Sequence, residues 1–161
     1  MKPNLRKVRY NLAHVRALRG EFAAAAEWTL HAAESARTGA MNGVYLLLYL
    51  PAPRTWSPPD AIWSTAAVAA ADVAGTLLAQ ARCLEALAGK YDRAEFAQVV
   101  GDTADLGVAA LRVLGWTWLT RFNDSSEAER LFDAALADAS EQDADVLQHE
   151  LDYARRDLSS S

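Results

Sequence analysis

The sequence has a single cysteine, Cys83, among 161 residues. One thiol cannot form an internal disulfide, and it cannot supply the several cysteine ligands of a structural zinc site. We therefore expect a reducing environment and predict a cytoplasmic location. No apolar segment follows the basic N-terminus, so the sequence indicates no secretory signal.

Glycine and proline are scarce, with eight and five residues. They gather in short clusters that suit helix ends. The alternation of β-branched residues typical of half-buried strands is missing. Alanine, the best helix former, is abundant instead. These features predict an all-α fold, and we expect one helical-repeat domain over residues 1–158 with a disordered tail at 159–161.

Long hydrophobic runs are missing too. The stretch at 61–79 is rich in alanine and contains Asp72, and the apolar stretch at 44–50 is too short to cross a bilayer. We therefore expect no membrane partner. The net charge of −5 argues against a nucleic-acid partner.

The N-terminal segment lacks acidic side chains, and the C-terminal segment nearly lacks basic ones. Residues 1–20 carry six basic side chains and no acid, whereas residues 123–152 carry ten acids against Arg130 alone. Two solvated helix faces would explain this pattern. The alternatives are a homo-oligomer in which the basic and acidic ends attract each other, or an acidic partner bound to the first helix.

Apolar side chains that recur at intervals of three and four predict about eight helices. In the first helix the predicted buried face is Leu5, Val8, Leu12 and Val15. Asp92 with Glu95 and Ser126 with Glu129 have the spacing of capping boxes, and the acids near 141–145 and 150–152 are expected on a solvated face. The predicted helices cover about 4–19, 22–38, 41–50, 57–88 as one or two helices, 92–100, 103–122, 126–139 and 142–158.

An internal repeat is visible in three segments, at 18–33, 87–101 and 121–139. The first two share a glycine, an aromatic residue two positions later and an alanine three positions after that. The third keeps only the later part of this pattern. The matching residues are Gly20, Phe22 and Ala25, then Gly89, Tyr91 and Ala94, then Ala128, Phe132 and Ala135.

This pattern resembles the tetratricopeptide repeat, a helical hairpin of about 34 residues. The resemblance implies antiparallel hairpins stacked as a short superhelix whose concave groove holds a peptide or helix. The unit expected at 41–71 departs from the pattern at Pro58-Pro59, and a non-repeat helical bundle is the alternative. Residues 74–139 also resemble the C-terminal repeat region of large ATP-dependent LuxR-type activators of high-GC bacteria, which implies a free-standing regulatory piece.

No catalytic, metal or cofactor site is predicted. His14, His31 and His149 are not spaced by one helical turn, and no histidine is spaced to activate a nucleophile. A glycine-rich phosphate loop is missing as well. An enzyme on a helical scaffold with a hidden pocket is therefore the weakest of three hypotheses.

The resemblance implies that the protein is a non-catalytic interaction or regulatory module. Carried onto this sequence, the groove positions imply an acidic or carboxylate-bearing protein or peptide as partner. The alternative is a small-molecule-binding domain with an aromatic pocket near residues 51–63, formed by Trp56 and Trp63. The groove residues are Lys7, Tyr10 and His14, then Thr76, Ala79 and Cys83, then Val113, Thr117 and Arg121.

Overall fold

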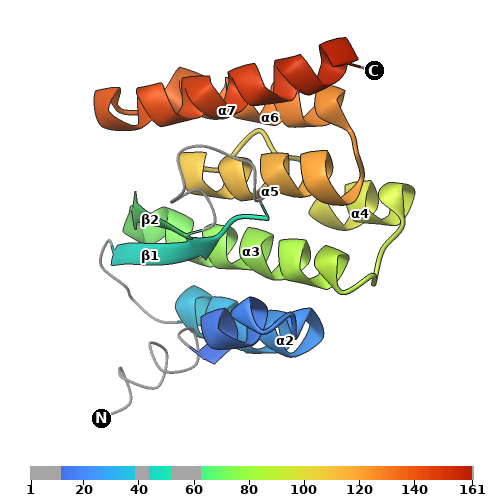
Figure 1. Ribbon diagram of the computed structural model, residues 1–161. Helices are drawn as coiled ribbons and strands as arrows, with labels where there is room; N and C mark the ends of the chain where they lie inside the picture. Colours follow the sequence, from blue (N-terminus) through green and yellow to red (C-terminus); the bar gives the residue numbers. More distant parts are fainter. Residues whose placement is uncertain (1–11, 39–43, 52–62, 161) are drawn as a thin grey trace.

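The computed structural model describes residues 12–38, 44–51 and 63–160 (Figure 1). This part of the chain is helical, as predicted, apart from one antiparallel pair of strands. A helix at 12–18 comes first. The elements after it are α2 (Phe22–Thr38), β1 (Val44–Tyr49), β2 (Trp63–Val68), the 3-10 turn η2 (Ala70–Asp72), α3 (Val73–Leu87), α4 (Arg93–Val100), α5 (Val108–Arg121), α6 (Ser125–Asp138) and α7 (Glu141–Ser160).

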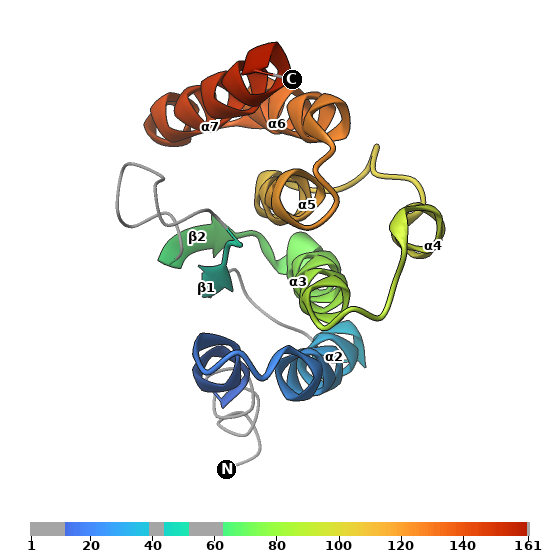
Figure 2. The same cartoon turned by 45° about the vertical axis from the view of Figure 1, so that its right-hand side comes forward.

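The helices pack in the order in which they occur along the chain. Helix α2 packs on α3, α3 on α5, α5 on α6, and α6 on α7. The helix at 12–18 lies with α2 at the lower end of the stack, and α6 and α7 lie at the upper end (Figures 1 and 2). The first and last layers are therefore separated by α3 and α5.

The predicted helix at 41–50 is wrong, because these residues include strand β1. The predicted helix from 57 to 88 is also wrong in its first part, where β2 lies, and becomes α3 only at Val73. The strands pair from Val44 opposite Val68 to Tyr49 opposite Trp63. A short apolar run can be a strand or a buried helix, and periodicity alone does not separate the two. Leu46 and Leu48, two residues apart, are both buried, as expected on one face of a strand.

Gln80 on α3 attaches strand β1 to the helical stack. The Tyr49 amide donates to Gln80 Oε1 over 2.8 Å, and Gln80 Nε2 donates to the Tyr49 carbonyl over 3.1 Å. The side chain therefore bonds the strand backbone as a neighbouring strand would. Both polar ends of this buried amide are thereby satisfied.

The glycines of the repeat end helices in the same way. Gly20 and Gly89 have φ of 76° and 85°, a conformation that glycine adopts without a steric penalty. In each turn the amide after the glycine donates to the carbonyl five residues before it, over 2.9 Å in the first turn and 3.1 Å in the second. The third turn instead has Asn123 at φ 51°. The first two repeat segments thus share a Schellman turn.

The matching alanines of the three segments differ in burial. Ala25 and Ala128 are fully buried, but Ala94 is exposed, and the buried residue of the short helix α4 is Phe96. Of the two predicted capping boxes, Asp92 with Glu95 is confirmed.

The second capping box is wrong. The Asp124 carboxylate caps α6 instead, accepting the amide of Glu127 over 3.0 Å. This pair has the same three-residue spacing as Ser126 and Glu129 and lies two residues earlier. Helix α7 continues to Ser160, so it includes two of the three residues expected in a disordered tail.

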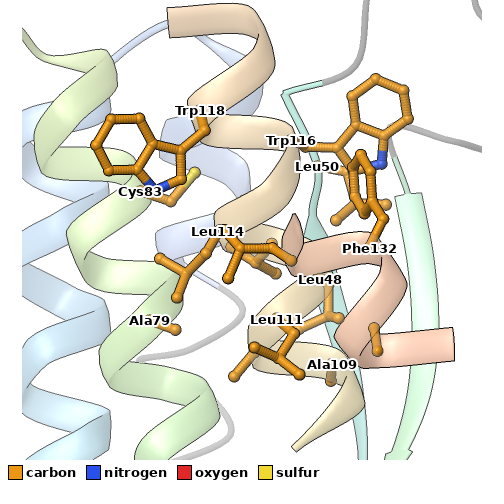
Figure 3. Packing of buried hydrophobic residues seen from close by; sticks show 14 of the residues in the cluster. Leu48, Leu50, Ala79, Cys83, Ala109, Leu111, Leu114, Trp116, Trp118 and Phe132 are labelled. Carbon is orange, nitrogen blue, oxygen red and sulfur yellow. The ribbon is translucent and has the colours of Figure 1, made fainter. Parts of the chain in front are cut away.

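Helix α5 carries two large aromatic side chains that enter different parts of the core (Figure 3). Trp116 meets Phe132 of α6 edge to face, with ring centres 5.5 Å apart. Trp118 lies beside Cys83 of α3 and contacts Phe96 edge to face at 5.1 Å. Both indoles are buried, so α5 is covered on both sides.

Gly115 lies at a close contact between α5 and α6. A Cβ atom added there would lie 2.5 Å from Cε1 of Phe132, and nothing surrounds the corresponding position at Gly75 of α3 within 4 Å. We expect Gly115→Ala to lower the free energy of unfolding by about 1–3 kcal/mol through overpacking. Gly75→Ala should raise it by about 0.5–1 kcal/mol, because alanine favours helix.

Urea denaturation of the two variants beside the wild type measures both effects. Adding Phe132→Leu to Gly115→Ala should recover part of the loss, since the leucine leaves room for the methyl group. Equal stabilisation by both alanine substitutions would show that α5 and α6 do not approach this closely.

Candidate functional site

Most of the predicted groove residues are part of the core. Lys7 and Tyr10 lie outside the described residues. Only Arg121 of the others has an exposed side chain. The buried residues are His14, Thr76, Ala79, Cys83, Val113 and Thr117.

The structure does bring several of these residues together, at the contact between α3 and α5. Cys83 of α3 and Thr117 of α5 are both fully buried, and the Thr117 hydroxyl donates to the carbonyl of Val113 over 2.8 Å. Arg121 Nε donates to the carbonyl of Ala86 over 3.0 Å. Helices α3 and α5 stack directly, and apart from the exposed Arg121 the predicted groove positions on them are buried, so a partner cannot reach those positions. Burial raises the pKa of Cys83 to about 12, which keeps the thiol protonated and unreactive.

The predicted aromatic pocket falls largely outside the described residues, since Trp56 is not among them. Trp63 begins β2 and pairs with Tyr49. Within the ranges 12–38, 44–51 and 63–160, no three histidine, cysteine or acidic side chains are grouped so that they could hold a metal ion. Over the same ranges no helix has both the length and the apolar character needed to cross a bilayer.

A buried acid that the sequence analysis missed lies between α5 and α7. Glu150 is fully buried, although the acids at 150–152 were expected on a solvated face. Arg112 Nε donates to its Oε1, and Trp116 Nε1 donates to its Oε2 over 2.5 Å. The signal was its position on the same helix face as the buried Leu147 and Leu151.

Burial raises the pKa of Glu150 to about 7, against the opposing effects of the Arg112 charge and of the hydrogen bonds from Arg112 and Trp116. A pKa in this range suits a general acid, but such a group must reach its substrate. The side chain of Glu150 has no exposed surface. We therefore interpret these three residues as a polar link between α5 and α7.

A second buried acid, Glu85, lies near the end of α3. Arg82 donates to it over 2.6 Å and Lys90 over 2.5 Å. Burial opposes ionisation of this carboxyl, but the two hydrogen bonds and the charge of Arg82 outweigh it and lower the pKa of Glu85. Both buried carboxyls therefore have partners within the chain.

The most unusual surface is on the helix at 12–18. The face predicted to be buried is exposed there, at Leu12 (40%) and Val15 (49%), and Leu18 is exposed by 59%. The opposite face, with Ala13 and Ala17, is buried instead. Alanine lets this helix approach α2 closely, which the larger side chains would prevent.

Leu12, Val15 and Leu18, named the N-terminal stripe here, are spaced by three residues and so lie along one side of the helix. Among the described residues the other large apolar side chains with comparable exposure are Leu78 and Val146, which stand singly on α3 and α7. Single exposed apolar residues are common, whereas a contiguous row indicates a contact surface. Arg16 and Arg19 beside the stripe are also exposed.

The opposite pKa shifts of the two buried acids predict that they affect the free energy of unfolding differently as the pH changes. The pKa of Glu150 is about 7 in the folded chain and near 4.5 ordinarily, so its contribution to stability is present at low pH and is lost as the pH rises through 7. Glu150→Gln removes this loss of stability, because glutamine does not ionise. Relative to the wild type, this variant should gain about 2–3 kcal/mol between about pH 5 and pH 8.

Glu85→Gln is the matched control. Because the pKa of Glu85 is lowered, its stabilising effect is lost only at acidic pH, and the difference from the wild type should stay constant from about pH 5 to pH 8. Urea denaturation across this range measures both differences. Parallel curves for Glu150→Gln and the wild type would contradict the raised pKa.

Comparison with protein-family models, with curated proteins and with solved structures finds no match for this chain.

Proposed function

We propose that the protein is a non-catalytic interaction module, a short tetratricopeptide-like stack that holds an apolar helix or peptide of a partner against the N-terminal stripe. The exposed row of Leu12, Val15 and Leu18 is the observation that carries this proposal. The proposed binding surface is therefore the outer face of the first helix. It is not the predicted groove, because the packing of α3 on α5 fills that space.

The buried polar groups bond to other parts of the same chain, which supports a binding role over a catalytic one. Glu150 and Glu85 are each bonded by two side chains of the same chain, and Cys83 is protonated. Buried groups that are satisfied in this way hold helices together. The exposed apolar surface, by contrast, has no such structural use in the described part of the chain.

The chemistry of the stripe favours a particular kind of partner. Each apolar side chain that becomes covered contributes roughly 25 cal/mol per Å² of buried surface. A row at three-residue intervals suits the apolar face of an amphipathic helix. Arg16 is paired with Glu21, and the exposed Arg19 would favour an acidic residue at the edge of that face. Charge complementarity of this kind speeds association and selects the partner.

The test compares two substitutions of exposed apolar residues. Val15→Asp places a charge in the middle of the stripe, and Leu78→Asp makes a similar change at the exposed residue of α3. Proteins captured from an extract of the source organism are identified, purified and titrated against each variant. We expect Val15→Asp to weaken binding by about tenfold or more and Leu78→Asp to leave it unchanged.

Both variants should keep the wild-type circular dichroism spectrum, because both positions are exposed. Equal binding of the purified partner by the wild type and Val15→Asp would refute the stripe as the binding surface. Equal loss of binding in both variants would refute it as well.

A further inference from the structure

The upper end of the stack carries a group of acids where α6 ends and α7 begins. Residues 138–146 contain four acids and no base. All four side chains are exposed, where α6 ends and α7 begins, and Val146 is exposed by 37% beside them. Asp138, Glu141, Asp143, Asp145 and Val146 are named the acidic end here. Leu147, the next residue along α7, is buried.

The sequence around the N-terminal stripe is basic, with six basic side chains and no acid in residues 1–20. Arg16 and Arg19 lie in the described part of that segment and are exposed. Arg16 Nη1 donates to Glu21 Oε2 over 3.1 Å, and Arg19 lies next to the exposed Leu18. The stripe and Val146 therefore each lie beside exposed charged side chains, basic at the stripe and acidic at Val146.

These two surfaces cannot meet within one chain. The helix at 12–18 lies with α2 at one end of the stack, and α7 lies at the other, with α3 and α5 between them (Figures 1 and 2). Electrostatic attraction between exposed charges also falls off beyond roughly 10 Å at moderate salt. Any close contact between the stripe and the acidic end must therefore join two copies.

We infer that the N-terminal stripe binds the acidic end of a second copy, so that the chains associate head to tail. This inference rests on the proposed function and names its partner. In this contact Leu12, Val15 and Leu18 cover Val146, and basic side chains face acidic ones. The added copy continues the sequence of helical layers, as neighbouring repeats do in a solenoid.

A head-to-tail contact uses two different surfaces, so an open complex retains one free stripe and one free acidic end. Such contacts close into a ring or extend as an open chain. They are also weakened by salt, because exposed charges supply part of the attraction.

Sedimentation velocity of the purified protein tests the inference. The mean mass of the wild type should rise with concentration at low salt, and the association should weaken by about tenfold or more at high salt. Val15→Asp, which alters the stripe, and Asp145→Lys, which alters the acidic end, should each abolish association. Leu78→Asp should associate as the wild type does.

Mixing the two defective variants provides the decisive measurement. The stripe of Asp145→Lys and the acidic end of Val15→Asp are both intact, so the mixture should associate although neither variant does so alone. A mixture that stays monomeric, or an Asp145→Lys variant that associates like the wild type, would overturn the head-to-tail contact.

The outcome is separable from that of the proposed function. A wild type that is monomeric at every concentration overturns this inference, but a different protein whose binding depends on Val15 would still support the interaction module. If Val15→Asp changes neither self-association nor capture, both are refuted.

Discussion

The burial of helix α5 on both sides is the constraint on which the other layers depend. Trp116 and Trp118 project into different parts of the core, and each needs a cover. Helix α3 with α4 covers one side, and α6 with α7 covers the other. A helix that is apolar around most of its circumference is stable only between neighbours. The stack must therefore extend in both directions from α5, and it ends where amphipathic helices can face water.

Polar side chains complete this arrangement at two places where apolar packing cannot. Gln80 satisfies the backbone of β1, and Glu150 accepts hydrogen bonds from Arg112 and Trp116. Hydrogen bonds of this kind are directional, so they hold a strand or a helix in one register where apolar contacts alone would tolerate sliding. The β1–β2 pair and α7 are thereby aligned with the central helices.

The sequence was most informative where a helix carries its own end signals, as at Asp92 and Gly89. It failed where tertiary packing overrides local pattern. The apolar run of β1 fits a strand or a helix equally well until its partner is known. In the helix at 12–18 the larger apolar face was expected inside, but close packing selected the alanines. Glu150 was misplaced because charge was equated with exposure, although its helix face predicts burial.

At the contact of α5 with α6, the Phe132 ring fills the space that a side chain at position 115 would need. The ring can lie where it does because the facing position has no side chain. Neither residue can change size freely unless the other compensates. During divergence of this chain the two positions are therefore coupled: a side chain acquired at 115 requires a smaller residue at 132.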